Sequence, residues 1–211
     1  MLIKASEVSN LTDARYFSAW RVEWIGFCLI PGHTAEVSPS ELLAIKEWIA
    51  GPKIVGEFPA LVDADTLDQY IEKVELDAVQ IGQFTPFEEV SHLDGRIGII
   101  REQVIEQLDE LAVLEDQWRQ WASLVDCFLL DLEKNNISWD MIKGDAQALA
   151  YLKSLCHVFP VMLSLRFQPE DLNEIEKVLK PYGISLKGGE EEAVGLKSFD
   201  DLDEIFEILN P

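Results

Sequence analysis

The sequence has few of the residues that bind metals or form disulfide bonds. Only three cysteines and three histidines occur among its 211 residues. Cys28 and Cys127 lie inside apolar runs, where cysteine behaves as a small hydrophobic residue. No two cysteines have the spacing of metal ligands, and His33, His92 and His157 are scattered along the chain. We therefore expect reduced thiols in a cytoplasmic protein, with no metal and no cofactor.

Basic residues are also scarce. The chain has 17 lysines and arginines against 39 aspartates and glutamates, which gives a formal net charge of −22. This charge argues against nucleic acid and against anionic membrane surfaces as partners, because both are polyanions. A small anionic ligand would need local positive charge against this background, so individual lysines and arginines become informative.

The chain lacks long apolar runs. No segment approaches the length of a membrane span, and the opening Met-Leu-Ile-Lys-Ala-Ser-Glu lacks the apolar core of a signal peptide. Hydrophobic residues make up 48% of the chain and charged residues 27%, which is ordinary for a globular protein. We expect a soluble protein of the cytoplasm.

The sequence does contain a regular alternation of short apolar runs and amphipathic stretches. Ser38, Pro39 and Glu41, for example, have the order of an N-cap, a first-turn proline and the glutamate of a capping box. The predicted strands are Leu2–Lys4, Trp24–Ile30, Lys53–Phe58, Asp77–Ile81, Arg96–Ile100, Asp126–Leu130, Pro160–Leu163 and Gly183–Leu186. The predicted helices are Thr12–Trp20, Ser38–Trp48, Asp65–Lys73, Pro86–His92, part of Gln103–Trp121, part of Trp139–Leu155, Pro169–Leu179 and Ser198–Leu209.

Eight strand–helix units predict an α/β fold with a parallel sheet, because right-handed crossovers join parallel strands. A doubly wound open sheet is one solution. Units of similar length favour closure into a (β/α)₈ barrel, the TIM barrel. The sequence shows no linker and no low-complexity tract, so we predict one domain over residues 1–211.

The run Asp126–Asp131 is the most informative of the strands. Its four central apolar residues suit a strand that is buried on both faces. Asp131 would then lie at the carboxyl end of the strand, where barrel enzymes place catalytic groups. Two interpretations stay open: Asp131 is catalytic, or it caps the next turn or pairs with a neighbour.

Several landmarks occur in the order found in one enzyme family. They are Lys4 with Asp13-Ala14, Ile25-Gly26-Phe27, Val37-Ser38-Pro39, Asp77-Ala78-Val79-Gln80, Phe128-Leu129-Leu130-Asp131, and Gly183 with Gly188-Gly189 and Gly195-Leu196-Lys197. On these motifs the chain resembles phosphoribosylanthranilate isomerase over essentially its full length. The resemblance implies a single-domain barrel of tryptophan biosynthesis that converts an aminoribose phosphate into an aminoketose. It also implies an aspartate as general acid, a cysteine as general base, an arginine for the anthranilate carboxylate, and glycine-rich phosphate turns.

The catalytic positions of that family are only partly kept. The general acid falls on Asp131, but the general base falls on Ser6. A hydroxyl is a poor base beside a thiol, whose pKa is near ~8.5. Glu7 replaces the adjoining glycine and is the candidate substitute base. The substrate arginine falls on Ala35, and a histidine of the fourth strand falls on Gly82.

The phosphate turns are altered as well. The loop after the sixth strand reads Leu132–Asn136, and Leu165-Arg166 stands where the family has Gly-Gly. A Cβ hinders close approach of the backbone to phosphate, although Arg166 could bind an anion by its charge. Lys187, Gly188 and Gly189 keep two glycines and add a cation. Arg166, Lys187, Gly188 and Gly189 are therefore the candidate phosphate-binding residues.

Three functions stay open at this stage. The first is an inactive or very weak relative that binds a small phosphorylated sugar, another small anion, or a protein partner. The second is a working isomerase in which Asp131 is the acid and Glu7 or Ser6 is the base. The third is a barrel enzyme with another substrate.

Purely structural roles are also open for the two cations and for the tryptophans. Arg166 and Lys187 could instead pair with nearby carboxylates such as Glu170 or Glu190–Glu192. Trp118 and Trp121 have i, i+3 spacing, which suits either a partner site or the buried face of a helix; we favour the buried face.

Overall fold

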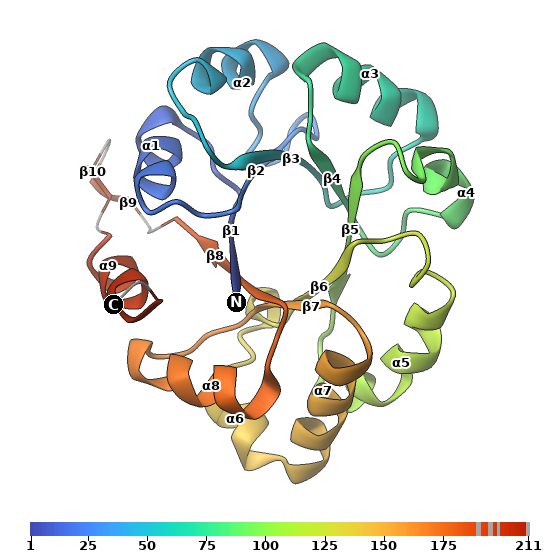
Figure 1. Ribbon diagram of the computed structural model, residues 1–211, viewed down its shortest axis with the longest axis vertical. Coiled ribbons are helices and arrows are strands. Elements are labelled where there is room, and N and C mark those ends of the chain that lie inside the picture. Colours follow the sequence, from blue (N-terminus) through green and yellow to red (C-terminus); the bar gives the residue numbers. More distant parts are fainter. Residues whose placement is uncertain (189–190, 194–195, 198, 210–211) are drawn as a thin grey trace.

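The computed structural model describes residues 1–188, 191–193, 196–197 and 199–209. Its main strands are β1 (Leu2–Ser6), β2 (Trp24–Cys28), β3 (Lys53–Phe58), β4 (Ala78–Ile81), β5 (Gly98–Val104), β6 (Cys127–Asp131), β7 (Val161–Ser164) and β8 (Gly183–Lys187). They pair in parallel and in chain order, and β8 returns to β1 from Gly183 opposite Leu2 to Lys187 opposite Ser6 (Figure 1). The predicted (β/α)₈ barrel is confirmed, and the open sheet is excluded.

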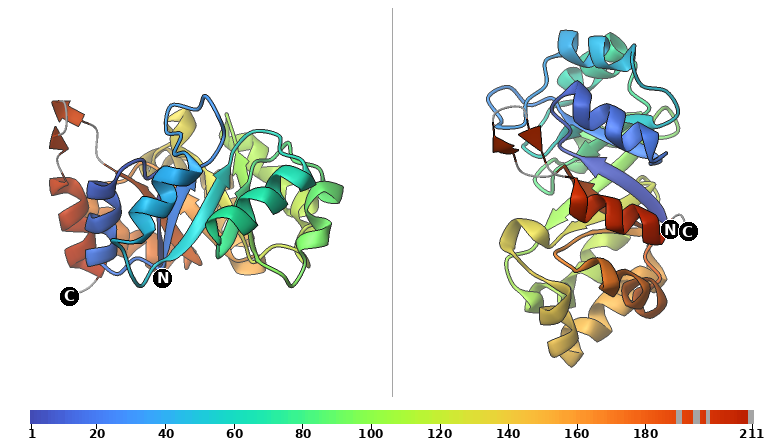
Figure 2. Two further views of the ribbon diagram at one scale, coloured as in Figure 1. Left: turned by 90° about the horizontal axis from the view of Figure 1, so that it is seen from above. Right: turned by 90° about the vertical axis from the view of Figure 1, so that its left-hand side faces the viewer.

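Helices alternate with the strands and form a ring around the barrel (Figures 1 and 2). The α-helices are α1 (Leu11–Ala19), α2 (Pro39–Lys46), α3 (Ala64–Val74), α4 (Phe87–Val90), α5 (Leu111–Arg119), α6 (Trp139–Gly144), α7 (Ala146–Val158), α8 (Leu172–Leu179) and α9 (Asp200–Leu209). The 3₁₀ segments are η1 (Ser91–Leu93), η2 (Leu108–Glu110), η3 (Glu133–Asn135) and η4 (Pro169–Asp171). None of the described helices has the length and apolar character needed to span a bilayer.

The ends of the ring meet where α9 packs beside α1 (Figure 2). Tyr16 stacks on Phe199 with ring centroids 4.0 Å apart, and Trp20 stacks on Phe206 at 5.1 Å. These aromatic contacts join the first and last helices of the chain, so the ring of helices closes as the sheet does.

Local sequence signals explain where several of the helices begin and end. The predicted capping box of α2 is present, since Ser38 Oγ accepts from the Glu41 N–H and Glu41 Oε2 accepts from the Ser38 N–H. The helical segment predicted within Trp139–Leu155 is divided in two, because Asp145 ends α6 and its carboxylate caps α7. Ser198, the predicted cap of the last helix, lies outside the described residues.

Two differences from the predicted elements stand out. β5 continues to Val104, so the stretch Gln103–Trp121, part of which was predicted as a helix, begins as a strand. A short antiparallel pair, β9 (Glu191–Ala193) and β10 (Leu196–Lys197), follows the barrel and was not predicted. Trp118 and Trp121 are 1% and 4% exposed, which confirms that both are buried, although Trp121 lies in the turn after α5 and not on the helix.

The barrel interior has an apolar half and a polar half. The apolar cluster consists of Val55, Ala78, Ile100, Cys127, Leu129 and Met162. Side chains alternate along a strand, so residues two positions later face the same interior. Five of those positions are polar and buried: Glu57, Gln80, Glu102, Asp131 and Ser164. The polar half therefore lies at the carboxyl ends of the strands, where the candidate residues were predicted.

Candidate functional site

The candidate residues that the structure describes lie at the carboxyl end of the barrel, as predicted. Each ends a strand or follows it by one or two positions, although this placement does not test their roles. They are Ser6 at the end of β1, Glu7 just beyond it, Asp131 at the end of β6, Arg166 just beyond β7, Lys187 at the end of β8 and Gly188 just beyond it. Gly189 lies outside the described residues.

A buried ion pair lies next to Ser6. Lys4, two residues earlier on β1, is fully buried, and its ammonium group pairs with Glu57 of β3. Lys4 Nζ also donates to Ser6 Oγ at 2.5 Å, and Ser6 Oγ shares a hydrogen bond with Ser185 Oγ at 2.6 Å. The Ser6 hydroxyl is thus held between an ammonium group and a second hydroxyl.

Gly26 makes room for this ion pair. A Cβ at Gly26, in the middle of β2, would overlap Glu57 Oε1 and would come within 2.8 Å of Lys4 Nζ. Burying two charges is unfavourable unless their geometry is good and their remaining hydrogen-bonding capacity is used. Gly26 is therefore required by the space that Lys4 and Glu57 occupy, not by a turn.

Glu7 adopts a backbone conformation that glycine prefers. Its φ is 53°, in the left-handed region that costs a residue with a Cβ about 1 kcal/mol. The Glu7 N–H donates to Glu57 Oε2 at 3.0 Å, and its carboxylate lies 3.2 Å from Lys187 Nζ. The family glycine that Glu7 replaces suits this backbone without strain, whereas Glu7 adds a carboxylate at the mouth of the barrel.

Asp131 is engaged with Lys134, which lies on η3. One carboxylate oxygen of Asp131 accepts from the Lys134 N–H at 2.9 Å, and the other lies 3.6 Å from Lys134 Nζ. The same ammonium group pairs with Glu102 of β5. Asp131 therefore caps the turn after its own strand and pairs with a neighbour, which is the structural alternative that the sequence left open. The Lys134 side chain connects β6 with β5 across the polar half.

The two lysines at the mouth are held in their charged form. Burial acts to lower the pKa of Lys134, but Glu102 and Asp131 outweigh it and raise the pKa above its usual value. Burial opposes the charge of Lys187 in the same way, and Glu7 with Asp131 raises its pKa. Both cations are thus stabilised chiefly by carboxylates of the mouth itself.

These contacts leave little space at the centre of the mouth. The cavity that Ser6, Glu7, Asp131, Lys134 and Lys187 help to line has a volume of only about 10 Å³. A volume of ~10–15 Å³ is roughly the least that admits one water molecule. A sugar phosphate could enter the centre only after the ion pairs had moved.

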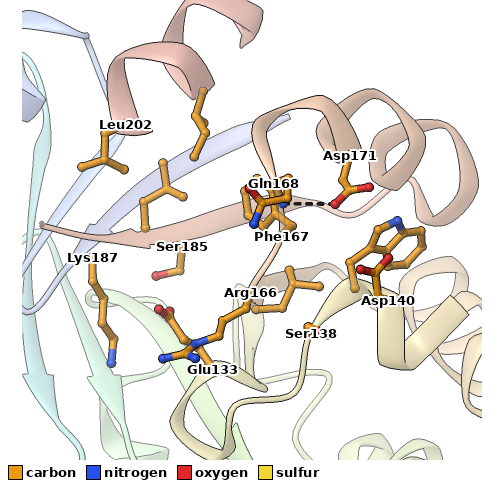
Figure 3. A pocket seen from close by; sticks show the side chains of 14 residues that line it. Glu133, Ser138, Asp140, Arg166, Phe167, Gln168, Asp171, Ser185, Lys187 and Leu202 are labelled. Carbon is orange, nitrogen blue, oxygen red and sulfur yellow. Dashed lines mark hydrogen bonds between the residues drawn. The ribbon is translucent and has the colours of Figure 1, made fainter. Parts of the chain in front are cut away.

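A larger cavity adjoins the mouth, between the loops after β6 and β7, the end of β8, and α9. Its volume is about 430 Å³, and its lining includes Arg166, Lys187, Ser185 and Glu133. Figure 3 shows the side chains of Arg166 and Lys187 ending toward the same side of this cavity. The structure thus brings the two predicted anion-binding side chains to one cavity.

The predicted pairing of these cations with Glu170 is not observed. Lys187 pairs with Glu7, and Arg166 forms no ion pair in the part of the chain that the structure describes. Glu190 and the side chains of Glu191 and Glu192 lie outside what the structure describes, so that part of the prediction stays open.

Of the two altered family positions Gly82 and Ala35, the structure gives a physical basis for Gly82. A Cβ at Gly82 would overlap the carbonyl oxygen of Pro59, so the loop after β3 excludes any side chain there, and a histidine above all. Ala35 lies in the turn after β2, where its N–H donates to His33 Nδ1 at 3.2 Å. The mouth therefore lacks both the histidine and the guanidinium that the resemblance would place near a substrate.

Sequence reasoning missed the residues that fill the mouth, namely Lys4, Glu57, Glu102 and Lys134 in their ion-pairing roles. Glu57 did carry a signal, because it is a lone charge inside the apolar strand Ile54–Phe58. Its partner is 53 residues away, and the partner of Lys134 is 32 residues away. Only the register of the closed barrel reveals which charges meet.

Comparison with known proteins agrees with this architecture. No family model matches the chain. N-(5'-phosphoribosyl)anthranilate isomerase of Agrobacterium fabrum (strain C58 / ATCC 33970) is 24% identical over 190 residues, which cover 88% of this chain and 84% of that protein.

Solved structures give the same result. Phosphoribosyl anthranilate isomerase from Thermus thermophilus superposes with a TM-score of 0.75 at 25% identity, covering 99% of this chain and 98% of that one. The enzyme from Thermotoga maritima gives a TM-score of 0.77 at 20% identity, covering 98% and 97%. The resemblance of this chain to the phosphoribosylanthranilate isomerase family, indicated by its motifs, is thereby confirmed.

Proposed function

We propose that the chain is a phosphoribosylanthranilate isomerase-like barrel in which the isomerase activity is lost or very weak, and which binds a small phosphorylated ligand or another small anion. The observation that carries this proposal is the filled mouth. Three ion pairs, whose residues come from four strands and two loops, leave about 10 Å³ where a substrate would have to meet Ser6 and Asp131.

The chemistry of the mouth supports the loss of activity. The rearrangement requires a base at the sugar C2 proton and an acid at the ring oxygen. Ser6 accepts a hydrogen bond from the Lys4 ammonium group, so its oxygen is not poised to remove a proton. Both oxygens of Asp131 are directed to Lys134. Loss of one positioned acid or base typically lowers the rate by about 10²–10⁴.

One observation favours the alternative, a working isomerase with Glu7 as base. Strained residues tend to gather at functional sites, and Glu7 keeps a carboxylate at the mouth in a left-handed conformation. Its partner Lys187 lies near the surface, with a side chain that is 27% exposed, so this ion pair could open. The Glu7 hypothesis therefore belongs in the same experiment.

Complementation tests the two views. The gene is expressed at a low level in a tryptophan-requiring bacterial strain that lacks the isomerase, and we expect no growth without tryptophan. Purified protein should likewise show no conversion of the aminoribose phosphate. Robust growth that Asp131→Ala abolishes would overturn the proposal, and equal damage from Glu7→Gln would identify the base. Asp116→Ala is the matched control, because the Asp116 side chain is 95% exposed.

Anion binding rests on Arg166 and Lys187 at the 430 Å³ cavity. We expect weak binding, because Lys187 is already paired with Glu7 and the chain carries a charge of −22. Asp140, Asp171 and Glu133 also line the cavity and add to the repulsion. Attraction of a phosphate group to the two cations would thus be opposed by repulsion from the surrounding negative charge.

Calorimetric titration with ribose 5-phosphate tests this part. Binding should be weakened by the double variant Arg166→Ala/Lys187→Ala. Lys153→Ala, which removes an exposed lysine from α7, serves as the control and should leave the affinity unchanged. No binding, or binding that the double variant does not alter, would assign both cations a structural role and favour a protein partner.

A further inference from the structure

A separate cavity lies on the outer wall of the barrel, away from the mouth. It is open to solvent and is lined by the loop after β4, by β5, and by the end of α5 with the turn that follows, where β5 runs between α4 and α5 (Figure 1). Its volume is about 240 Å³. The residues that matter here are Gln83, Phe84, Arg101, Gln103, Trp118 and Trp121.

Arg101 is a buried cation without a counter-charge. Ile100 and Glu102 face the barrel interior, so Arg101 between them faces the helices. It is 8% exposed, and no carboxylate pairs with it in the described part of the chain. Burial lowers its pKa to about 10, which leaves it charged at neutral pH.

Protein groups accept hydrogen bonds from only some of the N–H donors of this guanidinium. Nη1 donates to the carbonyl of Thr85 at 3.3 Å, and Nη2 donates to the carbonyl of Gln83 at 2.9 Å. The group stacks on Trp121, with its central carbon 3.5 Å from the ring centroid. A guanidinium has five N–H donors, so donors remain after these two bonds. A buried charge in this state favours an anionic acceptor.

Trp118 lies in the lining of the same cavity. It is 1% exposed, and its indole N–H has no acceptor among the described residues. Burying an N–H donor without an acceptor costs about 1–3 kcal/mol. The indole nitrogen is itself fully covered, so Arg101 is the donor that the cavity offers to a ligand. A group that only accepts hydrogen bonds would satisfy the remaining donors of Arg101.

The lining is also free of negative charge. None of its eight residues is acidic, although the chain has 39 acidic residues. Each of the other four described cavities has at least one glutamate in its lining. Among the described cavities, this one therefore has the lining that repels an anion least, in a protein that is strongly acidic as a whole.

We propose that this cavity binds a small organic carboxylate with a flat apolar body. The planar fork of a guanidinium matches a carboxylate in bidentate geometry. Phe84, which is 73% exposed, offers aromatic surface to the flat part of the ligand. The volume is below the ~300–1,000 Å³ of sites for drug-sized ligands, so a molecule with a single ring fits best.

Titration with sodium benzoate, followed by NMR of the tryptophan indole N–H signals, tests this proposal. Sodium chloride is kept at matched ionic strength, and Trp118→Phe assigns the Trp118 signal. We expect that signal to shift to saturation with benzoate. Benzamide, which has the same ring without the charge, should bind far more weakly.

Three variants separate a site from a surface effect. Arg101→Lys keeps the charge but loses the fork and should weaken binding about tenfold or more. Gln117→Glu places a carboxylate on the exposed rim without touching the core, so it should weaken binding even if Arg101→Lys does not fold. Arg119→Lys is the control, because Arg119 is outside the lining and its side chain is 61% exposed. Absence of saturable binding, equal binding of benzamide, or no effect of either lining variant would overturn the proposal.

Discussion

At several positions of the mouth, the atoms that surround a residue explain which residue type is present. Gly26 is a glycine because Lys4 and Glu57 fill the space of its missing side chain, and Gly82 because the Pro59 carbonyl does. The sequence shows both glycines but gives no reason for them. Glu7 is the opposite case, a side chain kept where the backbone would favour glycine.

Gly26→Ala should therefore destabilise the fold. The added Cβ would force the ends of Lys4 and Glu57 to shift within a buried site, and overpacking of this kind typically costs about 1–3 kcal/mol. Denaturant unfolding measures this loss of free energy. Gly144→Ala, at the end of α6 with no atom within 4 Å of its added Cβ, is the control and should be neutral or slightly stabilising. Equal stability of the two variants would contradict the space argument.

At the scale of elements, the sequence predicted what depends on local patterns. All eight strands were located within a few residues, and the α2 capping box was recognised from four consecutive residues. Asp131 at the end of β6 followed from the apolar run before it. What local patterns could not show is that Lys134 would reach Glu102 on another strand, because that contact depends on barrel closure.

The link between β5 and the loop after β6 can be tested as a pair. Lys134→Met leaves Glu102, whose side chain is 3% exposed, without its cation and should destabilise the fold by about 3 kcal/mol or more. Adding Glu102→Gln removes the uncompensated charge and should recover most of that loss. Unfolding free energies of the two singles and the double give the coupling. Additive effects would show that the ion pair is not what holds the mouth closed.

At the scale of the whole molecule, the fold of an isomerase family is combined with a strongly acidic charge. Cations are used where they neutralise carboxylates of the mouth, which are buried in the pairs of Lys4 and Lys134 and half-buried in the pair of Lys187. Arg101 on the outer wall is different, because no carboxylate of the described residues neutralises its charge, which is stabilised by the Trp121 ring and, in our proposal, by a ligand. The same scaffold thus has a closed central mouth and a cationic cavity on its side.

The excess of negative charge should also govern the response to salt. A net charge of −22 destabilises the compact state by self-repulsion, which falls as the Debye length shrinks from ~30 Å at 0.01 M to ~8 Å at 0.15 M salt. The buried ion pairs of the mouth are screened much less. We therefore expect Tm, followed by circular dichroism, to rise with sodium chloride over this range. Lys153→Glu should steepen the rise, while Lys153→Gln should change it about half as much. A Tm that falls with salt would mean that surface attraction outweighs repulsion, contrary to this account.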